Sequence, residues 1–451
     1  MKSVSIVRYI ALVAMVAGLS FVATPVTVAQ TSTDTPAPAS ADLAKRVDDL
    51  EKQLNDLKAQ LAAQKPAAAP AAAAAAAPEA AALPAAAPAA PAPTGIAALL
   101  GPTTLSGFVD VYYGYNASQP ASRTDALRNF DINSGQFGLN MIEMIADKAP
   151  DATAGRVGYH FSLGFGQAMN AVNSASPTDL GFDQYLKEGY IDYLAPVGKG
   201  LTITVGKFVT PAGAEVIESK DNWNYSRSLL FAWAIPYFHF GANAKYAFNS
   251  KFAITGYLVN GWNNSIDNNT GKTGGFSAAW TPNAKFSIIE NYLFGPEHNN
   301  DNGDFRHLTD TVITYNPTAK LSLMANYDYG HDHFVSSAVS GVPPFITGPA
   351  AKWSGLAGYL KYAPNAKYAL ALRGEYFDDN QGFETGTSQE LNEFTVTFQR
   401  MFAKSLITRL EVRHDSSDAA VFPRGNVGDP NVKSQTTVAL GLIYAFTTAP
   451  Q

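Results

Sequence analysis

Charged residues gather at two kinds of position where they could act on a solute passing in water. One set lies within the aromatic-rich stretch 210–236 and comprises Glu215, Glu218, Lys220, Asp221 and Arg227. The other set alternates with apolar residues in two later segments and comprises Arg373, Glu375, Arg409, Glu411 and Arg413. Acidic and basic groups around a narrow pore impose a field and a size limit on what passes. We therefore take the first set as candidates for a pore constriction and the second as candidates for a pore wall.

Three other motifs resemble ligand sites, but each lacks a required residue. The segment 331–333 is His-Asp-His and has no third metal ligand nearby. The segment 271–273 is Gly-Lys-Thr, as in a phosphate-binding loop, yet Ile266 stands where the first glycine belongs. The stretch 298–303 resembles a calcium loop but begins with His298 in place of an acid. No Ser/His/Asp set follows from the spacing, so we expect no catalytic residues, metal or cofactor, and no enzyme.

The elements that carry the second charged set are expected to be β-strands, because apolar and polar residues alternate in them. In 157–165 every second residue is Val, Tyr, Phe or Leu, while the residues between are Gly, His or Ser. In the last such run Val438, Leu440, Leu442, Tyr444 and Phe446 share one face. About sixteen runs of this kind lie between 101 and 446. The alternation is weak around 140, 310 and 355.

The connections between these runs alternate between tight turns and long loops. Three of the turns are variants of one Pro-Asn-Ala-Lys pattern, at 281–285, 316–320 and 363–367. The long loops are 117–130, 167–182, 210–236, 261–272, 295–305, 330–351, 378–389 and 415–432. This rhythm is typical of an outer-membrane barrel, and in hydrocarbon only a closed ladder satisfies the backbone. We predict an all-β fold: a closed antiparallel transmembrane β-barrel of about 16 strands over 101–446.

The side chains of the two expected faces are consistent with this barrel. Tyr and Phe fall near many strand ends, as in aromatic girdles at a membrane interface. The alternative is a soluble sheet with an aromatic core. We favour the girdle, because inner charges such as Arg373 and Glu411 would be costly in a dry core, whereas a lumen would provide water.

The N-terminus indicates export. Lys2 and Arg8 precede the apolar stretch 9–22, and small residues follow before a cleavage site near 29, so we predict a signal peptide over 1–29. No later segment has 18 uninterrupted apolar residues, so membrane insertion must use strands. The chain has no cysteine, which excludes disulfides. A net charge of −6 without a basic cluster disfavours nucleic acid as a partner.

Two further segments precede the barrel. In 41–64, apolar residues at alternating spacings of four and three form a coiled-coil seam: Leu43, Val47, Leu50, Leu54, Leu57 and Leu61. Because a lone helix of this length is marginal in water, we expect self-association, with a trimer favoured, although the helix could instead lie on another surface. The Ala/Pro-rich stretch 65–100 is an extended linker. It would leave the coil in the periplasm, within reach of the cell wall.

The loop 210–236 would be the third long loop. A loop this long and aromatic could fold into the barrel and narrow it. The alternative is an external cap, whose aromatic residues would contact neighbouring loops or another subunit.

At this loop the chain resembles a known family. The shared features begin with Gly206-Lys207-Phe208 and Pro211, continue through Asn224-Tyr225-Ser226-Arg227-Ser228 and His239-Phe240-Gly241, and extend to Asn260-Gly261-Trp262 and Gly295-Pro296-Glu297. In this order they resemble the OmpL-like putative β-barrel porin-2 family. The resemblance covers most of 101–446 and implies an outer-membrane porin. It implies little about the solute, and it does not explain the coil or the linker.

From these observations we expect a porin in outer-membrane lipid that allows passive diffusion of small hydrophilic solutes or ions. One alternative is a structural tether, in which coil and linker reach the cell wall. Another is a substrate-specific outer-membrane transporter with a plugged lumen, but 95–103 is too short for a sizeable plug.

Overall fold

The computed structural model describes residues 101, 103–173, 183–333 and 351–448, together with Lys52. The chain divides into two units, 1–89 and 90–451, and the fold described below belongs to the second. Apart from Lys52, the predicted signal peptide (1–29) and coiled coil (41–64) lie outside the described residues, as does the linker (65–100).

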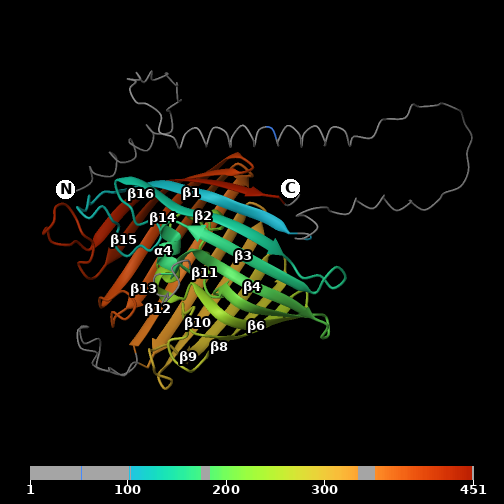
Figure 1. The fold of residues 1–451 in the computed structure, drawn as a ribbon. Coiled ribbons are helices and arrows are strands. Elements are labelled where there is room, and N and C mark those ends of the chain that lie inside the picture. The colour runs from blue at the N-terminus through green and yellow to red at the C-terminus, as the bar shows by residue number, and fades with distance from the viewer. Residues whose placement is uncertain (1–51, 53–100, 102, 174–182, 334–350, 449–451) are drawn as a thin grey trace, which may run out of the picture. The chain divides into compact units, whose positions relative to one another are not determined.

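Sixteen strands form one closed antiparallel barrel (Figure 1). They are β1 (Thr104–Asn116), β2 (Gln136–Lys148), β3 (Val157–Phe165), β4 (Leu186–Ala195), β5 (Leu201–Val209), β6 (Phe238–Asn249), β7 (Phe252–Val259), β8 (Thr273–Asn283), β9 (Phe286–Pro296), β10 (Phe305–Thr318), β11 (Leu321–Asp332), β12 (Ala351–Asn365), β13 (Tyr368–Asp379), β14 (Gln389–Ala403), β15 (Leu406–Ser417) and β16 (Ser434–Thr447). Each strand pairs with the next, and β16 pairs with β1 to close the ring. The predicted fold class is confirmed.

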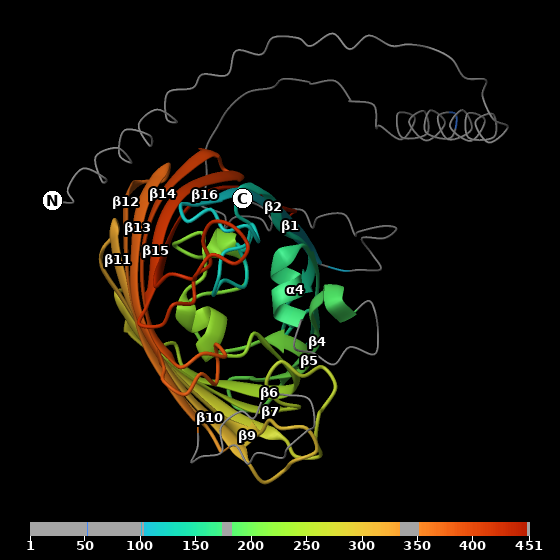
Figure 2. The same cartoon turned by 90° about the vertical axis from the view of Figure 1, so that its left-hand side faces the viewer.

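Within 103–173, 183–333 and 351–448, four short helical segments interrupt the long loops: α4 (Gln167–Asn173), η1 (Asp183–Tyr185), η2 (Ser219–Asp221) and η3 (Leu230–Ala234). In the view of Figure 2, α4 and the helical turns of the 210–236 loop lie within the ring of strands. Among the described residues, no helix combines the length and apolarity needed to cross a bilayer.

The two faces of the strands differ as their alternation predicts. In β3, Val157, Phe161 and Phe165 are exposed, whereas Ser162 between them is buried. In β16, Tyr444 and Phe446 are exposed while Ile443 is buried. The barrel therefore presents apolar and aromatic side chains outward along its strands, which is the arrangement that a lipid-facing surface requires.

Four of the tight turns are held by a side-chain oxygen at the end of the preceding strand. Asn249, Asn283 and Asn365 each accept a hydrogen bond from the backbone N–H of the residue two positions later, at 2.8–2.9 Å. At the fourth such turn, Thr318 accepts from Lys320 N at 3.2 Å. These short local bonds mimic a backbone turn, and they explain why similar sequences recur at one end of the barrel, here called the turn end. The opposite rim is the loop end.

Two of the stretches where alternation is weak have structural causes. At Asn140 the register shifts, because Asp110 pairs with Met141 while Val111 pairs with Leu139, so Asn140 forms a bulge. At Gly355 a Cβ atom would lie 2.6 Å from the Leu230 side chain. A larger residue at this inner position would collide with the 210–236 loop.

Candidate functional site

The loop 210–236 leaves β5 and returns to β6, but it contacts the inner face of strands far around the barrel. The Tyr225 hydroxyl donates to Asp110 Oδ1 of β1 at 2.9 Å. The Trp353 indole of β12 donates to Ala234 O at 3.0 Å. Tyr225 and Leu230 are fully buried. A loop rooted at β5 and β6 makes these contacts only by crossing the barrel interior, as Figure 2 shows.

Three wall arginines hold the loop by its backbone. Arg373 donates to Ser226 O at 2.7 Å, and Arg413 donates to Arg227 O at 2.6 Å. Arg409 donates to the carbonyls of Asn222 and Asn224 at 2.6 and 3.0 Å. Because a guanidinium offers five donors in a rigid fork, it can join several carbonyls of an irregular loop at once.

Wall carboxylates hold the same loop by its amides. Glu411 accepts from the backbone N–H groups of Tyr225 and Ser226 at 2.6 and 2.9 Å. Glu375 accepts from Leu230 N at 3.2 Å. The backbone of the loop is therefore held on both its donor and its acceptor side, without regular secondary structure across most of its length.

The positions of the five wall candidates differ from the expectation of a water-filled wall. Their side chains face inward, but Arg373, Arg409 and Arg413 are at most 2% exposed, and Glu375 and Glu411 are also buried. The loop covers them, and buried charges need paired partners rather than water. Arg373 finds these partners in Glu215, Glu375 and Glu393 at 2.8–3.0 Å.

The five loop candidates separate into two groups. Glu215 and Arg227 are buried in the packing between the loop and the wall. Lys220 and Asp221 form an ion pair with each other and stay open, with 24% and 55% of their side chains exposed. Glu218 reaches Lys187 of β4 and is 12% exposed. Only these last three loop candidates retain contact with the open interior.

A charged cluster that the sequence reasoning missed lies on the wall from β2 to β4. Lys187 contacts Glu143 at 2.7 Å and Glu188 at 3.1 Å in addition to Glu218. His160 extends the cluster toward the turn end through Asp147 at 3.0 Å and Glu188 at 3.5 Å. The side chain of Asp147 is 47% exposed.

The sequence pattern did not reveal this cluster, because the alternation of inward and outward residues breaks at Lys187 and Glu188. Lys187 and Glu188 are adjacent, so a regular strand would direct them to opposite faces. The register between β3 and β4 shifts at Ser162 and Leu163, and both charged side chains are buried. A bulge is difficult to place from a single sequence.

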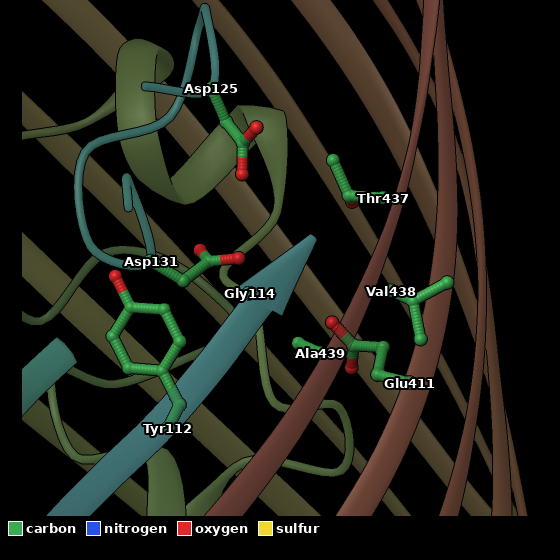
Figure 3. A pocket seen from close by; sticks show the side chains of 8 residues that line it. All are labelled: Tyr112, Gly114, Asp125, Asp131, Glu411, Thr437, Val438 and Ala439. Atoms are coloured by element: carbon green, nitrogen blue, oxygen red, sulfur yellow. The ribbon is translucent and has the colours of Figure 1, made fainter. Parts of the chain in front are cut away.

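The first long loop also folds onto the wall. Arg128 donates to Thr437 at 2.8 Å and pairs with Asp415 at 3.2 Å. Burial raises the pKa of Asp125 to about 6. Asp125 and Asp131 of this loop face Glu411 of β15 across a small pocket (Figure 3). The positive charge of Arg128 balances the negative charges of these acids. We therefore interpret the pocket as a gap in the packing of the loop against the wall.

The remaining motifs do not converge on a ligand site. Asp332 is buried and contacts Arg306 at 2.7 Å and His298 at 2.6 Å. His331 instead stacks on His307 with ring centroids 4.4 Å apart. Consecutive strand residues point to opposite faces, so 331–333 cannot gather around one ion. In the described part of the chain, no group of three or more His, Cys, Asp and Glu residues is placed to hold a metal.

A closed barrel with an apolar outer face and a loop across its interior defines a porin-type membrane channel. The model of the family described as Putative beta-barrel porin-2, OmpL-like matches residues 102–446, and the chain belongs to this family. The protein is an outer-membrane β-barrel of the porin class, and its family indicates a channel rather than an enzyme.

The chain is similar to several solved porin and channel structures at low sequence identity. An anion-selective porin from Comamonas acidovorans has a TM-score of 0.52 at 12% identity, covering 76% of this chain and 99% of that chain. OmpF of Salmonella typhi in complex with daunomycin has a TM-score of 0.49 at 13% identity, covering 76% of this chain and 97% of that chain. The outer-membrane channel DcaP of Acinetobacter baumannii has a TM-score of 0.47 at 11% identity, also covering 76% of this chain and 97% of that chain. No curated protein sequence matches the chain. The likeness to the Comamonas porin shows the fold alone.

Proposed function

We propose that the protein allows passive diffusion of small hydrophilic solutes or ions across the outer membrane, through a passage narrowed by the loop 210–236. The observation that carries this proposal is the attachment of the loop to the wall by Arg373, Arg409 and Arg413. A loop bonded through its own carbonyls is a rigid obstruction. It would narrow the barrel permanently and would not act as a lid.

Under this proposal the charged residues divide by role. Glu218, Lys220 and Asp221 form the loop side of the constriction, and the cluster around Lys187 forms the facing wall. The five residues first considered as a pore wall (Arg373, Glu375, Arg409, Glu411 and Arg413) act as anchors for the loop, together with Glu215 and Arg227. Solutes would then meet the exposed part of this cluster, at Glu218 and Asp147, and would not meet the arginines.

The decisive experiment is single-channel recording in planar bilayers from purified, folded protein. Stepwise conductance is the expected result, and the absence of steps from protein that shows a heat-dependent shift on a gel would overturn the proposal. Loosening the loop with Arg409→Ala should change the size or noise of the steps. Arg400→Ala, which removes an arginine at the turn end of β14 that has no contact with the loop, is the matched control.

The N-terminal segments support an oligomeric form of this channel. We assign 1–29 to export and 41–64 to a periplasmic coiled coil that joins copies of the chain, with a trimer favoured. The linker 65–100 separates coil from barrel. A second candidate function, a tether to the cell wall, rests on these segments lying before the family match at 102–446. Deleting 41–94 tests it: a tether loses envelope integrity, whereas a pore retains its conductance.

A further inference from the structure

A basic patch lies on the outward face of β10, β11 and β12 at the loop end of the barrel. It comprises His307, His331, His333 and Lys352. In the register His331 is directly paired with His307 on one side and with Lys352 on the other. The ring of His331 lies 4.4 Å from that of His307 and 5.3 Å from that of His333, between centroids. His331 points to the same side as the exposed Tyr329, so the patch is a continuous outward surface.

An acidic patch lies on the same rim, three strands further round the barrel (Figure 2). It comprises Asp378 of β13, Glu390 of β14 and Asp418, which follows β15. Asp378 and Glu390 are directly paired, and they point to the same side as the exposed Tyr376 and Phe394. Asp418 Oδ1 accepts from the backbone N–H of Glu390 at 2.8 Å. Three carboxyl groups are thus held together on the outward face.

Neither patch is neutralised from within the chain. Across 103–173, 183–333 and 351–448, no ion pair involves a residue of either patch. Like charges directly opposite each other on a sheet are destabilising, so the paired acids Asp378 and Glu390 would gain from a cationic neighbour. The imidazoles and the ammonium group of the basic patch are hydrogen-bond donors that carboxylates accept. The two patches are therefore complementary to each other.

We propose that the two patches join three copies of the chain in a closed ring, with the basic patch of one copy against the acidic patch of the next. Such a contact joins two different surfaces, and it closes only if their directions fit the rotation. In a ring of three, the two contact directions on each copy differ by about 60°. Sixteen strands share the full circle, so the three strands from β11 to β14 span about 67°. A ring of four would need about 90°, or four strands.

The wall between the patches permits this approach. Gly358 of β12 and Gly374 of β13 are directly paired, and they point to the same side as the exposed Leu356 and Tyr376. A Cβ atom at either glycine would meet no other atom closer than 3.9 Å. The outward surface is therefore shallow at this point, where it would face the three-fold axis.

This inference rests on the oligomeric form of the proposed channel, and it names the surfaces on the barrel that make the contact. It requires neither conductance nor the coil at 41–64. A cross-linking test is read without channel recording. A barrel that conducts without linking, or links without conducting, therefore separates the two proposals.

The test uses cysteine pairs in the full-length chain, which has no cysteine of its own. His331→Cys and Glu390→Cys in one chain lie three strands apart, roughly 14 Å, which is too far for a disulfide within the chain. Mild oxidation in isolated outer membranes should give products of two and three linked chains on a non-reducing gel, and none larger. Each single variant should remain monomeric, because neither patch is complementary to itself.

The control pairs His331→Cys with Phe165→Cys. Phe165 is an exposed residue at the loop end of β3, on a distant part of the rim, and this variant should remain monomeric. Monomers alone from the His331→Cys, Glu390→Cys chain would overturn the proposal, as they would if the basic patch held lipid phosphate instead. Dimers from His331→Cys alone, which indicate a two-fold contact, or products of more than three chains would also overturn it.

A charge reversal gives a second measurement. Lys352→Glu should lower the temperature at which the oligomer separates on a gel, because it places an acid against the acidic patch. Glu390→Lys in the same chain should restore that temperature, since the two patches again carry opposite charges. A double variant no more stable than Lys352→Glu alone would contradict the pairing of these patches.

Discussion

The wall under the 210–236 loop and the wall from β2 to β4 use the same kinds of residue to different effect. Under the loop, Arg373 and Arg413 are covered, and backbone groups of the loop share in pairing their charges. On the other wall, Lys187 is surrounded by Glu143, Glu188 and Glu218, and exposure rises toward Asp147. An inward charge can therefore act on a solute only where no loop covers it.

Removing Arg373 should have the largest effect, because it bonds the loop and three acids at once. We expect Arg373→Ala to lower the free energy of unfolding by about 3–5 kcal/mol, the usual cost of breaking a buried ion pair from one side. Urea unfolding in detergent measures this. Arg400→Ala is the control, and a loss no larger than that of the control would contradict the anchoring role.

Lys187→Gln should lower the stability less than Arg373→Ala does. It should change the ion selectivity of the channel more. The substitution leaves three partly paired carboxylates, so we expect a loss of about 2–3 kcal/mol, near the cost of unsatisfied charged groups. It should also shift the reversal potential in a salt gradient toward cation preference, since the buried Lys187 would no longer offset the charge of Glu218, which is partly exposed. An unchanged reversal potential would mean that solutes do not meet this wall.

A third charged region gives a weaker, pH-dependent test. In the loop between β13 and β14, burial raises the pKa of Glu384 to about 8, and its Oε1 is enclosed without a partner. The folded state thus favours the protonated acid. This contribution to stability is complete below the unfolded pKa of 4.5 and is lost as the pH rises through about 8.

We therefore expect the loop to resist proteolysis better at pH 5 than at pH 9. Glu384→Gln should remove this part of the pH dependence and protect the loop at pH 9. Asp378→Asn, which alters an acid at the loop end of β13, serves as control. The same pH profile in Glu384→Gln and wild type would assign the dependence to another group.

Much of the fold was predictable from local pattern. The apolar residues of 157–165 and 438–446 alternate because lipid and interior lie on opposite sides of each strand, and the structure places them accordingly. The turns were predictable because Asn283 and Asn365 act on residues only two positions away. The exceptions were bulges, at Asn140 and at Lys187, where one residue changes the face of its neighbours.

The candidate site was predictable only as a set of residue types. The inward direction of Arg373, Arg409 and Arg413 could be read from the chain alone, because the face to which a side chain points depends on neighbouring residues in the same strand. Whether these groups meet water was decided by the path of the loop, since Arg373 bonds Ser226 across 147 residues of sequence. Burial depends on which distant segment covers a side chain, and a local period carries no information about that.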